Sequence, residues 1–159
     1  MIWKKGLSII ADEKTSNLIM GSFPGERSLI AKEYYFDKTN DLWKILGNIY
    51  AKDFKSMHYS ERIESILNEG LGLWDVYSDC QRSWGSSDRR IWGFFLNNFK
   101  DLKERWPAIE KVGLNGKVAG IYSENFSELG YETFILPSSS GANRRNQIKR
   151  LDDWINFLK

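Results

Sequence analysis

The side chains with the clearest potential for chemistry lie in two stretches near the two ends of the chain. Residues 18–25 read Leu-Ile-Met-Gly-Ser-Phe-Pro-Gly, and residues 135–143 read Ile-Leu-Pro-Ser-Ser-Ser-Gly-Ala-Asn. In each stretch an apolar run stops abruptly at small, turn-forming residues, which is typical of the places where α/β proteins bind ligands. Free backbone amides and hydroxyls at such turns can bind anions or the edge of a flat ring.

The first loop, Gly21–Gly25, permits two interpretations. Its glycines could let backbone amides approach a phosphate, or the pentapeptide could be a structural turn. Neither the P-loop spacing Gly-x-x-x-x-Gly-Lys-Ser/Thr nor the dinucleotide-binding spacing Gly-x-Gly-x-x-Gly occurs in the chain. Nucleotide hydrolysis and dinucleotide binding therefore lose support.

Three adjacent aromatic residues, Tyr34, Tyr35 and Phe36, precede a polar helix start at Thr39 or Asn40. Aromatic side chains on a loop can stack on a flat heterocycle. Alternatively, the aromatic rings cover the core and Asn40 caps the following helix. Asp75 ends another apolar run, where it could bind a ligand or the amides of a neighbouring loop.

The Ser-rich loop, Pro137–Asn143, offers hydroxyls and free amides directly before a basic segment that contains Arg144, Arg145, Lys149 and Arg150. This chemistry suits phosphates. The alternative is a helix N-cap with a flexible lead-in. A net charge of +2 is too small to indicate nucleic-acid binding by itself, so the local clustering of arginines carries more information.

The chain holds one cysteine, Cys80, and one histidine, His58, which excludes an intramolecular disulfide and a Cys/His metal cluster. We expect a buried or half-buried thiol at Cys80, a surface role for His58 and chemistry without a metal or cofactor. The 159 residues and 42% hydrophobic content predict a single domain spanning residues 1–159. No apolar run approaches the roughly 20 residues that span a bilayer, and residues 1–5 lack a secretory apolar region, so we expect a cytoplasmic protein without a membrane partner.

Strand-like and helix-like segments alternate along the chain. Apolar runs predict strands over 17–20, 71–76, 109–114 and 133–136, and helical spacing predicts helices over 41–50, 60–69, 95–105, 116–126 and 148–158. This alternation predicts an α/β fold, a three-layer α/β/α sandwich with a central four-stranded, mainly parallel sheet. The loops after the strands, at 21–40, 75–90, 115–117 and 137–143, then form the candidate site.

Five segments in this order resemble the uracil-DNA glycosylase superfamily, most closely its hypoxanthine-DNA glycosylase branch and next the mismatch-specific uracil/thymine-DNA glycosylases. They are 18–25, the Tyr34-Tyr35 pair before 40–43, 72–76 leading to Cys80 and 86–88, 114–117 and 136–143. The likeness covers most of the chain. The superfamily members that carry an iron–sulfur cluster on four cysteines are excluded by the single cysteine.

The resemblance implies an enzyme that flips a damaged base out of DNA and hydrolyses its N-glycosidic bond. It implies a catalytic role for Asn40, whose amide can orient water, and a stacking role for Tyr35. The implied base pocket comprises Gly21, Ser22, Phe23, Pro24, Tyr35, Asp75 and Asn115. The implied DNA-binding residues are Ser138, Ser139, Ser140, Gly141, Ala142, Asn143, Arg144 and Arg145, the last two as phosphate partners.

The chain departs from the family pattern at two places. The family's proline shortly before its asparagine is replaced in Asp37-Lys38-Thr39, and Gly141 stands where the hypoxanthine branch often has proline. Ser22 occupies the region where the mismatch-specific branch positions its water with an asparagine, which favours the hypoxanthine branch.

The leading hypothesis is a monomeric, monofunctional DNA glycosylase that acts on DNA containing a deaminated base, hypoxanthine or uracil. No lysine matches a nucleophile position in the family, so lyase chemistry is not expected. A second hypothesis is a nucleic-acid or nucleobase binding protein in which the altered residues 37–39 misplace Asn40. A third is an unrelated small-molecule α/β protein whose loops bind a nucleotide.

Overall fold

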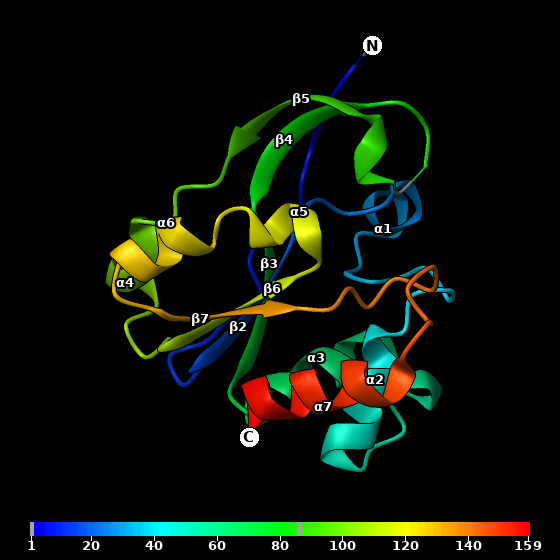
Figure 1. Cartoon of the computed structure of the whole chain (residues 1–159), viewed down its shortest axis with the longest axis vertical. Coiled ribbons are helices and arrows are strands. Elements are labelled where there is room, and N and C mark those ends of the chain that lie inside the picture. Colours follow the sequence, from blue (N-terminus) through cyan, green and yellow to red (C-terminus); the bar gives the residue numbers. More distant parts are fainter. Residues whose placement is uncertain (1, 86) are drawn as a thin grey trace.

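A four-stranded parallel sheet runs through the middle of the molecule in the order β3-β2-β6-β7 (Figure 1). Its strands are β2 (Asn17–Gly21), β3 (Leu71–Asp75), β6 (Lys111–Asn115) and β7 (Glu132–Leu136). The computed structural model describes residues 2–85 and 87–159. Two residues named above lie outside the described residues. They are Met1, which begins the segment without a secretory apolar region, and Ser86, which belongs to the family resemblance. The four predicted parallel strands are confirmed.

Both faces of this sheet are buried, which explains why its strands read as continuous apolar runs. Successive side chains of a strand point to opposite faces. In β2, Leu18 and Met20 therefore join one hydrophobic core while Ile19 joins the other. All three side chains have no exposed area.

Helices cover the two faces and complete the predicted three layers (Figure 1). One layer contains α2 (Leu42–Tyr50), α3 (Tyr59–Asn68) and α7 (Gln147–Leu158), with the 3-10 turn η1 (Phe54–Ser56) beside them. The other contains α4 (Asp101–Arg105), α5 (Lys117–Gly120) and α6 (Ser123–Glu128). The short helix α1 (Glu26–Ala31) follows the first loop.

A second, antiparallel sheet was not predicted from the sequence. Its order is β1-β4-β5, formed by β1 (Trp3–Lys5), β4 (Tyr77–Arg82) and β5 (Ile91–Leu96), and the 3-10 turn η2 (Asp88–Arg90) precedes β5. The predicted loop over 75–90 therefore contains a strand, and the predicted helix over 95–105 is helical only in α4. Register shifts within the β4–β5 pairing break the alternation that would have revealed β4.

The predicted helix over 116–126 is interrupted, because α5 and α6 are separate helices.

The strand order of the parallel sheet reverses around β2. The chain passes from β2 to β3 on one side, whereas β6 pairs with β2 on the other side. In open α/β sheets ligands bind at such a point, outside the carboxyl ends of the strands. Gly21 lies opposite Asp75 in the register, and Asn115 lies opposite Leu136. The loops that were expected to form the site therefore leave the sheet side by side.

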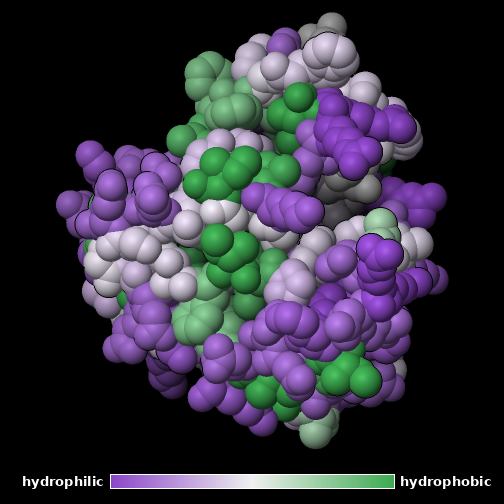
Figure 2. All heavy atoms as spheres, viewed as in Figure 1, coloured by the Kyte–Doolittle hydropathy of each residue, from purple (hydrophilic) through white to green (hydrophobic). Residues whose placement is uncertain are grey.

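Cys80 is buried without exposed area on β4, and His58 is exposed at the start of α3, as predicted. The His58 backbone amide donates to the Glu61 carboxylate, which completes a capping box. Polar atoms cover most of the face seen in Figure 2, and apolar atoms gather over its middle. Among the described residues, no helix has the length and apolar character needed to cross a membrane.

Candidate active site

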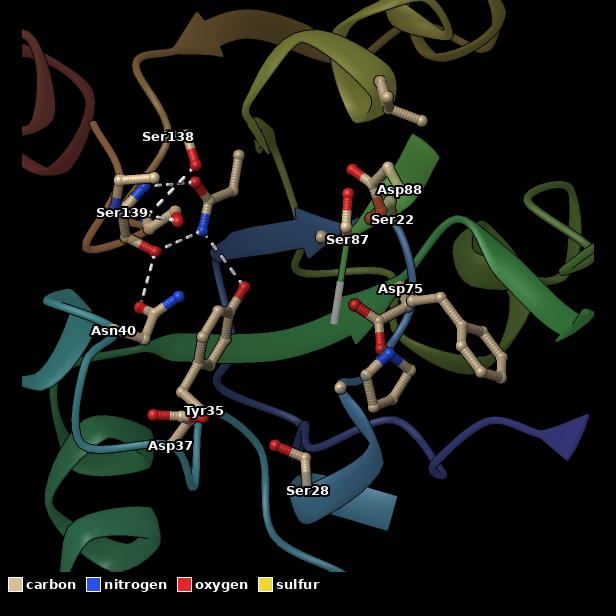
Figure 3. A pocket seen from close by; sticks show the side chains of 18 of the residues that line it. Ser22, Ser28, Tyr35, Asp37, Asn40, Asp75, Ser87, Asp88, Ser138 and Ser139 are labelled. Atoms are coloured by element: carbon tan, nitrogen blue, oxygen red, sulfur yellow. Dashed lines mark hydrogen bonds between the residues drawn. The ribbon is translucent and has the colours of Figure 1, made fainter. Parts of the chain in front are cut away.

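A cavity of about 530 Å³ opens at the carboxyl ends of the parallel strands (Figure 3). Its volume lies within the range of about 300–1,000 Å³ that is usual for small-molecule sites. The lining residues come from the four loops singled out in the sequence, except Val118, which lies on α5. They are Gly21, Ser22, Phe23, Pro24, Gly25, Ser28, Tyr34, Tyr35, Asp37, Thr39, Asn40, Asp75, Ser87, Asp88, Arg89, Asn115, Val118, Ser138, Ser139, Ser140, Gly141 and Ala142.

A chain of hydrogen bonds connects three of these loops. Asn115 donates from Nδ2 to the Tyr35 hydroxyl at 3.2 Å and to the Ser139 hydroxyl at 2.9 Å. Its Oδ1 accepts from the Ser139 backbone amide at 2.9 Å. The Ser139 hydroxyl in turn donates to Asn40 Oδ1 at 2.8 Å. Asn115 therefore positions its neighbours, with its polar atoms already engaged.

Ser139 differs from the DNA-binding role implied by the resemblance. Its side chain has no exposed area, and its hydroxyl and amide are used within the protein. Its carbonyl accepts from the backbone amide of Asp41 at 2.8 Å. A side chain buried in this way is not available to a phosphate, so Ser139 holds the Ser-rich loop against the segment that carries Asn40.

The Asn40 side chain has a defined orientation. Its Oδ1 accepts from the backbone amide of Leu42 at 3.0 Å as well as from Ser139. A backbone N–H can only donate, so this atom must be the amide oxygen and not the nitrogen. The Nδ2 group makes no hydrogen bond to the described residues and lies at the cavity wall (Figure 3). Asn40 therefore presents a hydrogen-bond donor to the cavity.

Tyr35 is held in an uncommon backbone conformation, with φ of +54° in the left-handed region. Such a conformation costs on the order of 1–3 kcal/mol and persists where surrounding contacts enforce it. The Trp43 indole supplies one such contact, because it donates to the Tyr35 carbonyl at 3.2 Å. Burial, and then the nearby Asp75 carboxyl, raise the pKa of the Tyr35 hydroxyl well above its usual range. The ring therefore stays neutral.

Gly21 forms part of the cavity wall between Tyr35 and Asp75. A Cβ at this position would lie 2.6 Å from Asp75 Oδ1 and 3.1 Å from the Tyr35 hydroxyl oxygen. The absence of a side chain therefore lets these two groups approach each other across the first loop. Neighbouring contacts fix the loop, because Ser22 donates to Asp88 at 2.6 Å and Arg82 donates to the Pro24 carbonyl at 2.6 Å.

Asp75 is a buried carboxyl, 5% exposed, on the cavity wall. Its pKa is raised to about 7, chiefly by burial and then by the Asp88 carboxylate, with Arg82 opposing both. Its Oδ2 atom has no hydrogen-bond partner among the described residues. The alternative that Asp75 binds neighbouring loop amides is therefore not supported for this atom.

An ion-pair cluster follows Asn40 in the structure, with Asp41 and Arg150 buried and Arg144 half exposed. Asp41 accepts from Arg144 at 2.8 and 2.9 Å and from Arg150 at 2.7 Å. The Arg144 hydrogen bonds hold the pKa of Asp41 below its usual range, with Arg150 acting in the same direction against desolvation. Arg150 also donates to the carbonyls of Ser138, Ser140 and Asn143. We call Asp41, Arg144 and Arg150 the arginine clamp, because it fastens the Ser-rich loop to the start of α2.

Two curated proteins resemble the chain over nearly its whole length. A hypoxanthine DNA glycosylase from Methanosarcina barkeri is 40% identical over 156 residues, which cover 98% of this chain and 98% of that protein. A hypoxanthine DNA glycosylase from Methanosarcina acetivorans is 37% identical over 151 residues, 95% of each chain. The chain belongs to the hypoxanthine DNA glycosylase family. Its function class is therefore that of a DNA glycosylase.

A solved structure supports the same assignment. The solution NMR structure of a proposed uracil DNA glycosylase from Methanosarcina acetivorans matches with a TM-score of 0.89 and 36% identity. The match covers 99% of this chain and 97% of that one. No protein-family model matches the chain. The resemblance to hypoxanthine DNA glycosylases noted in the sequence is thus confirmed.

The cavity of this hypoxanthine DNA glycosylase family member brings together most of the residues that the resemblance implied. Asn40, the whole implied base pocket and residues 138–142 line it. The last three implied DNA-binding residues do not line it. Asn143 donates to the Ser138 carbonyl at 2.9 Å and Arg144 belongs to the arginine clamp, whereas Arg145 is exposed and its side chain has no partner in the described part of the chain.

Several lining residues were not predicted to belong to the site. Ser28, Tyr34, Asp37, Thr39, Ser87 and Arg89 line the cavity, and so does Asp88, which the sequence marked only as part of the resemblance. Position in the loops 21–40 and 75–90 was the available signal for all of them. The arginine clamp had no such signal, since Asp41 is separated from Arg144 and Arg150 by about a hundred residues.

Proposed function

We propose that this DNA glycosylase removes hypoxanthine from DNA by hydrolysis, without lyase chemistry. One observation carries the proposal: the Asn40 amide donor and the Tyr35 ring line the same cavity at the carboxyl ends of the parallel strands. The names of the two curated relatives support hypoxanthine as the base. Uracil, which the name of the solved structure suggests, is the second base to test.

Cleavage of an N-glycosidic bond builds positive charge on the sugar and negative charge on the departing base, so the site must supply donors to the base and a positioned water. In the proposed arrangement the flipped base stacks on Tyr35, and the backbone amides near Ser22 and Phe23 bind its edge. The Asn40 Nδ2 group donates to an oxygen of the base or of the attacking water. The Asn40 carbonyl oxygen is already saturated, so Asn40 acts as a donor and not as an acceptor of a proton.

The rim of the cavity supplies the proposed contacts to DNA. Ser138, Ser140, Gly141, Ala142 and Asn143 form the accessible part of the Ser-rich loop, and Arg145 is the exposed cation beside it. Contacts of this kind position the duplex without reading its sequence. The proposal includes a single domain that acts as a monomer in the cytoplasm, on DNA that contains a damaged base, and without a cofactor.

The anchoring of Asn40 favours catalysis over the binding-protein hypothesis. That hypothesis required the altered residues 37–39 to misplace the asparagine. Asp37 instead accepts from the Thr39 amide at 2.9 Å and the Thr39 hydroxyl at 2.8 Å, which forms a closed turn before Asn40. The contacts of Asn40 with Leu42 and Ser139 then orient its amide toward the cavity.

The proposal is tested with labelled duplexes that carry hypoxanthine, uracil, or thymine opposite guanine, followed by alkaline cleavage of abasic sites. Asn40→Asp is the sharper of two variants, because it keeps the oxygen that accepts from Leu42 and Ser139 but lacks the NH₂ donor. Asn40→Ala removes both and is expected to cost about 0.5–2 kcal/mol of stability as well. We expect rate losses of about 10²–10³ for each variant.

Excision of hypoxanthine that both variants lose would support the assignment and the donor role of Asn40. Full activity in Asn40→Asp would contradict that role. Excision of uracil alone would show that the substrate base is uracil and not hypoxanthine. Salt-dependent DNA binding without excision of any base would favour the binding-protein hypothesis.

A further inference from the structure

The Asp75 carboxyl has chemistry that the roles described so far leave unused. It is almost fully buried on the cavity wall, and its Oδ2 atom lacks a hydrogen-bond partner among the described residues. Leaving a buried polar atom unpaired is costly, so such atoms in native proteins usually await a ligand or have a functional role. In Figure 3 the carboxyl points across the cavity toward Tyr35. A Cβ at Gly21 would lie 2.6 Å from Asp75 Oδ1 and 3.1 Å from the Tyr35 hydroxyl oxygen, so a ligand between the two side chains would meet Oδ1.

The backbone holds Asp75 in place at the junction of the two sheets. Its own carbonyl accepts from Asn97 Nδ2 at 2.7 Å. The next two amides, those of Val76 and Tyr77, donate to the carbonyls of Gly21 and Ser22 at 2.8 and 3.0 Å. The carboxyl is therefore fixed relative to the first loop, which forms one side of the cavity. A preorganised group of this kind is suited to a reaction that needs a set geometry.

Among the ionisable groups around Asp75, the Asp88 carboxylate disfavours its charged form. Tyr34 and Tyr35 also face Asp75. Burial and then the charge of Asp75 raise the pKa of both hydroxyls, so the two tyrosines stay neutral. Asp88 lines the same cavity; burial raises its pKa, and the hydrogen bond from the Ser22 hydroxyl, followed by Arg82, acts in the opposite direction. Asp37 lies elsewhere on the wall, with its pKa lowered by the hydrogen bonds from Thr39.

Arg82 is the cation that acts in the opposite direction. It does not form an ion pair with Asp75; it donates to the Pro24 carbonyl and lies 3.6 Å from the Glu26 carboxylate. With desolvation and Asp88 opposing it, the pKa of Asp75 stands at about 7. A substantial fraction of the molecules therefore carries a neutral carboxylic acid at this position near neutral pH.

We propose that Asp75 is the general acid of this site and donates its proton to a ring nitrogen of the excised purine. The inference rests on the proposed function and narrows its substrate class. Hypoxanthine presents lone pairs at N3 and N7 that can accept a proton. The corresponding ring nitrogen of uracil already carries hydrogen, and its other ring nitrogen is in the glycosidic bond. The acid therefore assigns the site to deaminated purines in preference to uracil.

The step balances without a further reactant. The proton moves from the Asp75 carboxyl to N3 or N7 of the base, and the electron pair of the C1′–N9 bond moves to the base as that bond breaks. Water forms the new C1′–O bond and releases its proton to solvent. The Asp75 carboxylate then takes up a proton from solvent. The products are the free base and an abasic site.

The test measures single-turnover excision of hypoxanthine from a duplex between pH 5.5 and 8.5, with the intact protein. For the wild type we expect a rate that falls as pH rises above about 7. Asp75→Asn is expected to lower the rate at pH 6 by on the order of 10²–10⁴ and to remove the pH dependence. Asp88→Asn removes a neighbouring charge, so the falling limb should move to lower pH. Asp79→Asn, on β4 and outside the cavity, is the matched control.

Substrate analogues give a second readout, the first part of which needs only the wild-type protein. Wild-type protein should excise 7-deazahypoxanthine or 3-deazahypoxanthine slowly, whichever lacks the nitrogen that accepts the proton. The Asp75→Asn substitution should cause little further loss on that analogue, because its partner atom is already absent. Equal losses on hypoxanthine and on both analogues would overturn the proposal.

The outcomes separate this inference from the proposed function. Wild-type excision of hypoxanthine with an unchanged pH profile in Asp75→Asn would overturn the acid role while the glycosylase assignment stands. Failure of the wild type to excise any purine would overturn both. The acid role would be supported if the wild-type excision rate falls with rising pH, Asp88→Asn moves that fall to lower pH and Asp75→Asn abolishes it.

Discussion

At the scale of single residues, the proposed function relies on groups whose directions are fixed before a ligand binds. Asn40 offers an NH₂ group because its oxygen is occupied, and Tyr35 offers a neutral ring on a strained backbone. Groups fixed in this way need little reorganisation when the base loses its bond to the sugar. This arrangement fits an enzyme whose proposed nucleophile is water.

Tyr35→Ala should impair excision more than Tyr35→Phe does. Alanine removes the stacking surface, which contributes about 1–3 kcal/mol per base, whereas phenylalanine loses only the hydrogen bond from Asn115. The expectation is a rise in KM of roughly tenfold or more for alanine and a smaller change for phenylalanine. Steady-state kinetics on a hypoxanthine duplex measures both. Equal effects of the two substitutions would instead indicate a role for the hydroxyl.

Much of the cavity lining could be predicted from the sequence, because loops at the carboxyl ends of parallel strands form the ligand site in this architecture. The partners of those residues could not be predicted. The resemblance and the hydroxyl chemistry of the loop assigned Ser139 to DNA binding, yet this residue is buried and bonded to Asn40, about a hundred positions away. Long-range pairing leaves no local pattern.

At the scale of elements, the arginine clamp determines how the Ser-rich loop lies against α2. Asp41→Asn leaves Arg150 buried without its charged partner, which should cost about 3–5 kcal/mol in the free energy of unfolding at pH 7. Chemical denaturation measures this loss. Asp53→Asn, an exposed aspartate outside the clamp, is the matched control. A loss no larger than that of the control would contradict the importance of the clamp.

The same substitution should change the acid stability of the protein. The pKa of Asp41 is lowered in the folded state, so its contribution is present above the unfolded pKa of about 4 and is lost as pH falls toward the folded value. The gap in stability between wild type and Asp41→Asn should therefore narrow below about pH 4. A gap that stays constant with pH would show that the carboxylate charge is not involved.

The two segments that depart from the family pattern, residues 37–39 and Gly141, lie in contact in the structure. A Cβ at Gly141 would lie 2.1 Å from the Thr39 carbonyl oxygen, so the backbones of the two loops are in direct contact. Gly141→Ala should push residues 39–41 away from the Ser-rich loop and cost about 1–3 kcal/mol. Excision should fall at least tenfold, as Asn40 moves with that segment. Gly93→Ala is the control, because its nearest atom would be 3.5 Å away.

The parallel sheet and the helices α2, α3 and α7 could be predicted because each buries an apolar face with a regular period. The antiparallel sheet could not. In β4 the irregular pairing and a buried arginine, Arg82, hide the alternation, and β5 exposes Trp92, Phe94 and Phe95. The apolar residues at the end of β5 lie close in sequence to those of α4, so together they resemble the pattern of one helix. This explains the wrong prediction over 95–105.

At the scale of the whole molecule, the net charge of +2 gives little general attraction to DNA, so individual cations should matter. Arg145→Gln is expected to reduce the slope of log binding constant against log salt concentration by about 1. Binding to a duplex at several salt concentrations measures this slope. Arg105→Gln on α4, away from the cavity, should leave it unchanged. An Arg145→Gln slope equal to that of the wild type would exclude the phosphate contact.

The burial of Cys80 gives the molecule an intrinsic reporter. It is the chain's single thiol, it has no exposed area on β4, and burial raises its pKa, which further slows reaction with alkylating reagents. Alkylation therefore requires β4 to separate from the core, so the labelling rate measures how often the junction that carries Asp75 opens. A bound DNA duplex should slow that labelling by favouring the closed state. Ligand binding can thus be followed by mass spectrometry on the unmodified protein, without an engineered probe.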